Sequence, residues 1–405
     1  MTHKLIPDLF KTEYSKLVAV LCKQFGLKQL EIAEDIAHDT FLLATESWQH
    51  NGAPENPVAW LYAVAKNKTR DFLKREILFE QKIAPQLHIN QSESIDPDFS
   101  ETHIKDSQLQ MMFAICHPSI PLEAQTGLAL RILCGFGIDE IAAAFLSSKS
   151  TINKRLYRAK EILRKENIPL ELPPENTLEK RIDGVLRTLY LLFNEGYHAT
   201  SKNQLLQKEL CIDAMRLTKM LCNNHKTAKP QCFALLALMC FHASRFEART
   251  DKAGVMILYE DQNRELWNEE LIDKGNYYLI KSAAGPVTKY HLEARIAYWH
   301  SSKIEHQNKW EYILQLYNYL LQLEYSANTA LNRTYALAKV QGFEIAITEA
   351  LKLNLNNNVF YHALLGKLYA KADIGKAIKA YSKAMELSPS PALQKQLEKQ
   401  LNELL

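Results

Sequence analysis

Glycine, proline and long apolar runs are all scarce in this chain. Its 405 residues include 13 glycines and 14 prolines, and the alternating β-branched pattern of a half-buried strand rarely persists, which argues against a large β-sheet. Apolar residues instead recur at spacings of three and four, as on the buried side of an α-helix. The sequence therefore predicts an all-α fold, and its length allows two or three domains.

Membrane and secretion signals are also missing from the sequence. No stretch reaches the roughly 20 consecutive apolar residues that a bilayer-spanning helix needs. Residues 1–10 do not contain the apolar segment of a signal peptide. We therefore expect a soluble, cytoplasmic protein with no membrane partner.

The seven cysteines do not form the paired pattern of a disulfide framework or a zinc site. Their one local cluster lacks the CxxC spacing of common zinc sites, and it comprises Cys222, His225, Cys232, Cys240 and His242. We expect packed, reduced thiols and a surface histidine, with no metal and no cofactor. Phosphate-binding glycine loops, HExxH and nucleophile motifs are absent as well, so we expect no catalytic residue and no enzyme.

Charge does not by itself mark a nucleic-acid binder, because the net charge is only +3. Composition divides the chain into five predicted parts. Residues 1–77 hold amphipathic helices that end in a basic run, and residues 78–106 form an acidic linker. Residues 107–168 form a second helical unit, residues 169–177 a proline-rich hinge, and residues 178–405 a series of helix pairs.

A helix-turn-helix is predicted near residues 138–165. Gly135 and Gly137 end the preceding helix, and a short helix opens with acidic residues that suit its N-terminal dipole. Ser148 is placed to cap the next helix, which has an apolar side and a basic outer side. A basic helix alone is more often just a solvated face. The short helix and tight turn before it favour DNA binding in a major groove.

Two amphipathic helices are predicted in the first part of the chain. The helix from Glu31 to about Trp48 carries Glu31, Glu34, Asp35 and Asp39 in its first turns. These acids either stabilise the helix dipole or face a basic partner surface, and both readings stay open. The second helix, residues 58–76, interleaves basic and aromatic residues. That pattern fits a solvated face, and it also fits single-stranded DNA, on which bases stack and phosphates pair.

In this order, the two units resemble an extracytoplasmic-function RNA polymerase sigma factor. The marks of sigma region two are residues 33–36, 39–41, 60–61, 65–67 and 71, and those of region four are residues 140–142, 148, 151, 155 and 158–160. The resemblance implies two small helical sigma domains, a region two bundle and a region four helix-turn-helix. It also implies that the chain binds the β′ clamp and β flap of core RNA polymerase and recognises promoter DNA.

The resemblance assigns roles to individual residues. The residues that it places against core polymerase are Asp35, Asp39 and Phe41. Those that it places on the melted −10 element are Asn56, Lys66, Asn67, Arg70, Lys74 and Arg75. Those that it places on the −35 element are Lys149, Ser150, Asn153, Lys154, Arg155 and Arg158. Two positions depart from the family pattern: residues 145–146 are Phe-Leu in place of Leu-Gly, and Arg70 stands where an aliphatic residue is common.

The C-terminal half resembles the tetratricopeptide-like extension that a subset of these sigma factors carries. Its marks are residues 189–197, 248–251 and 260–262. One repeat follows the tetratricopeptide pattern at Leu365, Gly366, Tyr369, Ala377, Tyr381, Ala384 and Pro389, where small residues let paired helices approach closely. The polar signature residues are expected to make buried hydrogen bonds and not to catalyse, and they are Asn194, Glu195, Arg249, Asp251 and Asp261.

Together these patterns predict a sigma factor whose C-terminal half either binds a regulatory protein or only stabilises the chain. The alternative is a helix-turn-helix regulator with a repeat domain that acts beside a different sigma factor. A third reading is a scaffold whose basic helix is incidental. Promoter-dependent initiation with core polymerase alone distinguishes the first reading from the other two.

Overall fold

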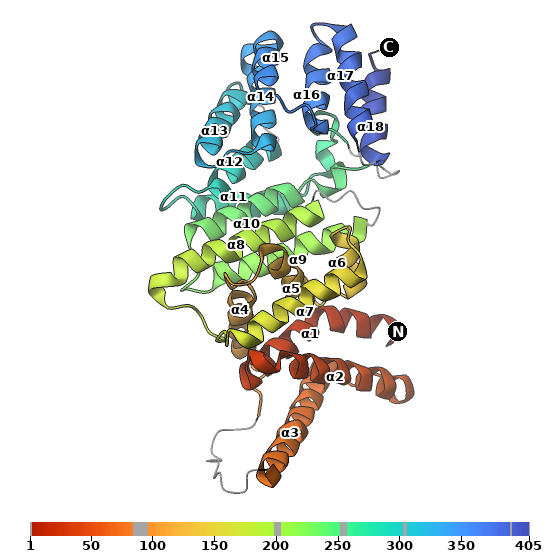
Figure 1. The fold of residues 1–405 in the computed structure, drawn as a ribbon, viewed down its shortest axis with the longest axis vertical. Helices are drawn as coiled ribbons and strands as arrows, with labels where there is room; N and C mark the ends of the chain where they lie inside the picture. The colour runs from red at the N-terminus through yellow and green to blue at the C-terminus, as the bar shows by residue number, and fades with distance from the viewer. Residues whose placement is uncertain are drawn as a thin grey trace. The chain divides into compact units, whose positions relative to one another are not determined.

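The computed structural model describes residues 2–83, 96–197, 204–251, 257–302, 306–388 and 391–404. The regular structure in these ranges is helical, which confirms the predicted all-α fold (Figure 1). The chain forms two compact units, Met1–Glu195 and Gly196–Leu405. In the part of the chain that the structure describes, no helix has the length and apolar character needed to cross a membrane.

The first unit contains the helices that carry the predicted interfaces. They are α1 (Thr2–Phe25), α2 (Leu30–Asn51), α3 (Pro57–Ile83), α4 (Glu101–Ile115), α5 (Leu122–Leu128), α6 (Ile138–Ala144) and α7 (Lys149–Lys165), and α8 (Glu175–Tyr197) begins there. The predicted linker, residues 78–106, thus includes the end of α3 and the start of α4, and its residues 84–95 lie outside the described ranges.

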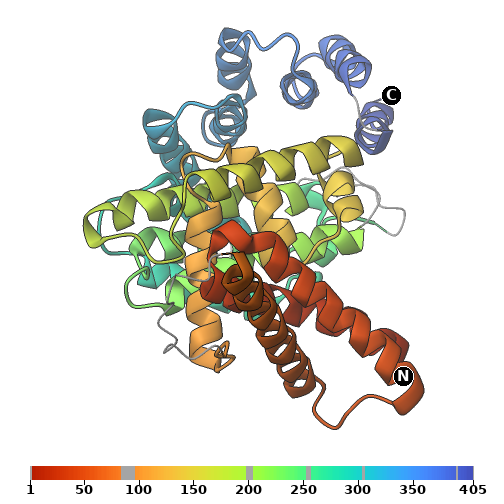
Figure 2. The same ribbon diagram turned by 60° about the horizontal axis from the view of Figure 1, so that its bottom comes forward.

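The core of the first unit forms around α1. This helix packs against α2, α3 and α4, and Figure 2 shows α2 and α3 lying beside each other. Tyr14, Leu17 and Leu21 of α1 are fully buried, as is Leu61 of α3. A π-helical turn, η2 (Ala129–Leu133), also packs against α1, so the two predicted sigma-like modules share one apolar interior.

The second unit is a succession of helices in which each described helix packs against the one that follows it. Its helices are α9 (Gln204–Asn223), α10 (Pro230–Ala243), α11 (Glu269–Lys281), α12 (Lys289–Ser301), α13 (Lys309–Leu323), α14 (Ala327–Gln341), α15 (Phe343–Lys352), α16 (Val359–Tyr369), α17 (Ile374–Leu387) and α18 (Pro391–Asn402). Among the described residues between α10 and α11 lie the short 3₁₀ turns η3 (Phe246–Ala248), η4 (Tyr259–Asp261) and η5 (Arg264–Leu266).

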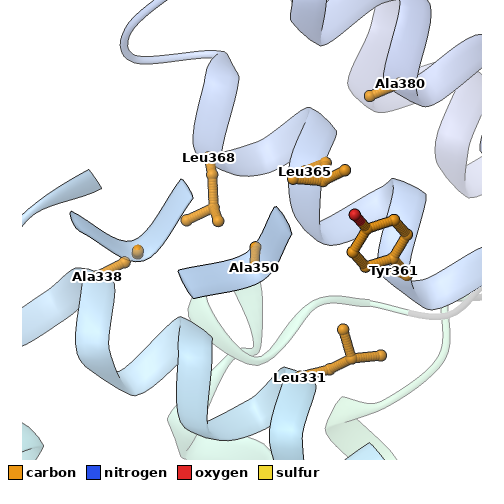
Figure 3. Packing of buried hydrophobic residues seen from close by; sticks show 8 residues of the cluster. Leu331, Ala338, Ala350, Tyr361, Leu365, Leu368 and Ala380 are labelled. Carbon is orange, nitrogen blue, oxygen red and sulfur yellow. The ribbon is translucent and has the colours of Figure 1, made fainter. Parts of the chain in front are cut away.

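The last helices of this unit pack closely through small residues. A Cβ atom at Gly366 of α16 would lie 2.8 Å from the ring of Tyr381 in α17, so only glycine fits there. Figure 3 shows Leu331, Leu365 and Leu368 in the apolar cluster that joins α14, α15 and α16. The close approach predicted for the paired helices of the repeat is therefore confirmed for α16 and α17. Pro389, the last residue of the predicted repeat, lies outside the described residues.

The cysteines are buried and free, as predicted. All seven are buried and none forms a disulfide bond, and burial raises the pKa of Cys222 above its ordinary value. The Cys232 thiol donates a hydrogen bond to the carbonyl of Thr227 at 3.3 Å, and His225 is exposed. Within the described ranges, no group of three or more potential ligands gathers as a metal site.

Candidate nucleic-acid interface

Helix α7 has an apolar side and a basic outer side. Ser148 caps it, because its Oγ accepts a hydrogen bond from the backbone N–H of Thr151 at 3.1 Å. Four residues on one side of the helix are buried: Ile152, Leu156, Ala159 and Leu163. The predicted cap and the predicted buried side are both confirmed. The outer side is left open to solvent.

Helix α6 and a short turn lead into α7. The Glu140 carboxylate accepts a hydrogen bond from the backbone N–H of Gly137 at 2.7 Å, which stabilises the start of α6. After α6, Leu146 has a φ of 47°, in the left-handed region that glycine prefers. Its side chain is 73% exposed. The leucine that departs from the family pattern therefore keeps the backbone conformation that a glycine would adopt there.

The residues predicted to contact the −35 element differ in their exposure and in their ion pairs. Five of the six are exposed: Lys149, Ser150, Asn153, Lys154 and Arg158. Lys149 Nζ lies 2.6 Å from the Asp139 carboxylate of α6. Arg155 is partly buried and lies 3.1 Å from the Glu123 carboxylate of α5. Arg155 thus bridges α7 and α5, and Lys154 and Arg158 are the two of these cations that face solvent with no ion pair to another described residue.

Helix α2 carries the residues predicted to contact polymerase. Asp35 and Asp39 are exposed, whereas Phe41 is only 5% exposed and packs on Phe10 of α1, with ring centroids 4.9 Å apart. Phe41 therefore lines the floor of an apolar hollow of about 500 Å³ between α1 and α2. Leu42, on the rim of this hollow, is 58% exposed. Leu42 was not predicted from the sequence. Its place on the otherwise polar side of the amphipathic pattern was the signal that could have identified it.

The residues predicted to contact the −10 element lie at the start of α3 and along it. Asn56 caps the helix, because its side-chain oxygen accepts a hydrogen bond from the N–H of Ala59 at 3.0 Å. Lys66 is partly buried, and the other members are exposed: Asn67, Arg70, Lys74 and Arg75. Arg70 donates hydrogen bonds to both carboxylate oxygens of Asp96. The predicted cations thus share one helix, and one of them already binds an anionic group.

Tyr62 of α3 belongs to the same surface and was not predicted from the sequence. Its hydroxyl donates a hydrogen bond to Glu13 Oε2 at 2.5 Å, and Glu13 is 5% exposed. Its ring stacks on Phe99, with centroids 4.7 Å apart and planes 12° from parallel. The segment that follows residue 95 therefore returns to α3 and lies against it.

A buried ionic cluster joins the two modules of the first unit. Glu34 of α2 is 4% exposed and pairs with Lys160 of α7. Arg131 of η2 lies 3.9 Å from the other Glu34 oxygen, and its guanidinium lies 3.2 Å from His38 Nε2. Burial, and then the Arg131 charge, lowers the pKa of His38. Glu34 is therefore buried inside the unit and cannot face a partner surface.

Among the polar signature residues of the C-terminal half, Arg249 makes partly buried structural contacts. Arg249 stacks on the Tyr197 ring at 3.6 Å and donates a hydrogen bond to the Tyr197 carbonyl at 2.8 Å. Burial raises the pKa of Glu195. Asp251 and Asp261 are exposed, so the expectation of buried hydrogen bonds was wrong for these two.

Glu260 of η4 is held by three donors from α14 and α16. Lys339 Nζ and Lys367 Nζ lie 2.7 Å and 2.9 Å from its carboxylate, and the Tyr335 hydroxyl donates to it at 2.5 Å. Burial raises the pKa of Glu260, but these hydrogen bonds outweigh burial and lower it to about 2. A single carboxylate thus fastens the η4 segment to two helices of the second unit.

Comparisons with known proteins match both the N-terminal module and the chain as a whole. Residues 10–76 match the model of Sigma-70 region 2, and residues 181–283 match a family of unknown function, DUF6596. An uncharacterised protein of Rhizobium meliloti is 32% identical over 391 residues, covering 93% of this chain and 91% of that protein.

Two relatives with functional names match part of the chain. The ECF RNA polymerase sigma-E factor of Haemophilus influenzae is 24% identical over 174 residues, which cover 40% of this chain and 88% of that protein. The RNA polymerase sigma factor YlaC of Bacillus subtilis is 24% identical over 168 residues, covering 41% of this chain and 94% of that protein. No solved structure matches the chain.

Proposed function

The chain belongs to the family that includes the uncharacterised protein of Rhizobium meliloti, and we propose that it is an extracytoplasmic-function sigma factor with a repeat-like helical extension. One observation carries this proposal. The two sigma relatives align over 174 and 168 residues, well beyond the stretch 10–76 that matches region 2. The alignments also cover 88% and 94% of those two sigma factors, which supports more of a sigma factor than region 2 alone.

In this proposal the first unit binds core RNA polymerase and reads two promoter elements. Helix α2 docks on polymerase through Asp35, Asp39 and the exposed Leu42 beside the apolar hollow. Helix α3 holds the melted −10 element, and α7 inserts its exposed side into the major groove of the −35 element. The factor acts by binding and strand capture and performs no bond chemistry of its own. The second unit is a tetratricopeptide-like extension in this proposal, and it supplies a surface for a regulatory protein.

The decisive experiment supplies core polymerase and this protein alone to a library of genomic fragments and measures run-off transcription. Specific transcripts that depend on the added protein support the sigma assignment. Failure to initiate, together with failure to co-elute with core polymerase, rejects it. The intact chain is the right reagent. A truncation at the predicted hinge would remove α8, whose Arg181 donates a hydrogen bond to the Phe113 carbonyl of α4 at 2.6 Å.

The polymerase surface is tested by one substitution and a matched control on the same helix. Asp35→Ala removes an exposed charge from α2, four residues before Asp39 of the hollow, and we expect it to weaken co-elution with core polymerase several-fold. Glu46→Ala removes an exposed charge from a later turn of α2 and should leave co-elution unchanged. Equal effects of the two substitutions would contradict the assignment of this surface.

The DNA surface of α7 is tested by salt dependence. Lys154→Ala and Arg158→Ala should each reduce the slope of log affinity against log salt by about one unit, because each cation releases one counterion on binding phosphate. The control is Lys165→Ala, since Lys165 is exposed on the same helix and lies 3.5 Å from the Glu161 carboxylate. Unchanged slopes for the first two variants would leave the rival reading, a regulator or scaffold, in place.

A further inference from the structure

One face of α3 combines an aromatic ring with two cations. Tyr62, Lys66 and Arg70 are spaced four residues apart, so their side chains lie one above another along the helix. This surface, Tyr62–Lys66–Arg70, is called the α3 face below. Arg70 and Lys66 were predicted to meet the −10 strand, and Tyr62 adds a flat ring at one end of their row.

The α3 face is covered by residues 96–99 of the same chain, called the acidic segment below. At one end Asp96 accepts two hydrogen bonds from the Arg70 guanidinium. At the other end the Phe99 ring stacks on the Tyr62 ring. Between them, the charge of Lys66 acts on both Asp96 and Asp98 and helps to lower the pKa of each carboxyl. Each group of the α3 face is thus matched by a group of the acidic segment.

The acidic segment offers the α3 face the same kinds of groups that a single nucleic-acid strand would offer. Single-strand binding surfaces offer cations to the phosphates and aromatic rings to the unpaired bases. The acidic segment offers anions to the same cations and a ring to the same tyrosine. A DNA strand and the acidic segment cannot both occupy these donors and this ring at once.

We propose that the acidic segment is a built-in competitor of single-stranded DNA on the α3 face, and that a melted strand displaces it and stacks a base on Tyr62. This inference rests on the proposed function, since it names a further DNA-contacting residue of the same surface and a device that regulates it.

The contacts are suited to exchange. The side chains of Arg70 and Asp96 are 45% and 41% exposed, and exposed ion pairs of this kind contribute little stability in water. The ring of Tyr62 has a firmer support. Glu13, which accepts the Tyr62 hydrogen bond, is almost fully buried and also lies 2.7 Å from Lys16 Nζ. When the acidic segment leaves, the Tyr62 ring therefore stays in place for the incoming base.

The test measures binding of a labelled single-stranded oligonucleotide to the full-length protein by fluorescence anisotropy. A triple variant, Asp96→Asn, Asp98→Asn and Phe99→Ala, removes the competing groups, and we expect it to bind the strand at least fivefold more tightly than the wild type. The matched control is Glu101→Gln with Asp106→Asn. It removes the same charge from the start of α4, where Glu101 pairs with Lys105 of its own helix. It should change the affinity less than twofold.

Two results would overturn the proposal. One is an equal gain in the control and the triple variant, since that would be a general effect of net charge. The other is an equal gain for a duplex of the same sequence, because paired bases cannot stack on Tyr62.

A second pair of variants, made in the triple-variant background, tests the role of Tyr62. Tyr62→Phe keeps the ring and loses the hydroxyl, whereas Tyr62→Ala loses both. We expect the phenylalanine variant to keep its affinity and the alanine variant to lose about tenfold, as for one stacked base. Equal losses would show that Tyr62 matters only through its hydrogen bond to Glu13, and would contradict the stacking role. Co-elution with core polymerase is scored separately, so a failure of the sigma assignment is distinguishable from a failure of this competition.

Discussion

Leu146, in the turn before α7, provides a test of backbone conformation. At this position a glycine variant should be more stable than an alanine variant, the reverse of the order inside a helix. Because Leu146 has a φ of 47°, any residue with a Cβ is strained there, by about 1–2 kcal/mol. Glycine avoids this strain but loses about 0.5–1 kcal/mol more conformational entropy on folding. The leucine side chain is 73% exposed, so comparing Leu146→Gly with Leu146→Ala isolates the backbone term.

The expected difference follows from these magnitudes. Leu146→Gly should be more stable than Leu146→Ala by about 0.75 kcal/mol, the middle of the strain range less the middle of the entropy range. At Lys154, an exposed position inside α7, the order should be the ordinary one, with the glycine variant about 1 kcal/mol less stable than the alanine variant. The turn and the helix should thus respond with opposite signs to the same pair of residues.

Native-state hydrogen exchange of the α6 and α7 amides is the suitable assay, because it reports local opening free energies in a chain of two units. A difference of 0.5–1 kcal/mol slows exchange by about two- to fivefold. If the glycine variant at position 146 exchanges faster than the alanine variant, the left-handed conformation assigned to this turn is wrong.

Three further predictions concern stability. Gly366→Ala should destabilise the second unit by up to about 2 kcal/mol, because overpacking against Tyr381 outweighs the helix preference of alanine. Gly184→Ala places its new Cβ no closer than 3.9 Å to a neighbour, so it should stabilise its helix by up to about 1 kcal/mol. Thermal unfolding checks both. Burial and neighbouring cations lower the pKa of His300 to about 3. As the pH falls, His300 is therefore protonated in the unfolded chain before it is protonated in the folded chain. The free energy of unfolding should fall by up to about 1.4 kcal/mol per pH unit below pH 6.5. Urea titrations should show a flatter pH dependence for His300→Gln. Glu260→Gln should destabilise the second unit at pH 7, and its difference from the wild type should vanish as the pH falls from 4.5 toward 2, since the native carboxylate is then protonated as well.

The sequence predicted local structure well because its signals are local. Ser148 caps α7 three residues before Thr151, and the four buried residues of that helix follow its 3.6-residue period, so both features could be predicted from neighbouring letters. The all-α fold and the buried cysteines follow from composition and periodicity in the same way.

Features that depend on distant partners could not be predicted. Periodicity places Phe41 on α2, but its burial depends on Phe10 of another helix. Likewise, only the folded chain brings Asp96 to Arg70 and Glu123 to Arg155. The assignments of individual residues to promoter elements remain predictions, since they concern contacts with DNA. The predicted domain boundaries remain predictions as well.

The contact of Glu34 with Lys160 limits how far apart α3 and α7 can be in this arrangement. Lys68 of α3 lies 3.1 Å from Asp39, which is little more than one helical turn from Glu34. Adding side-chain reach and helix rise along this path, Lys68 and Asn153 are at most about 50 Å apart. Any motion that moved α7 away from α2 would therefore have to break the Glu34–Lys160 contact and expose a buried carboxylate to water, so this one ion pair sets a cost on separating the two helices.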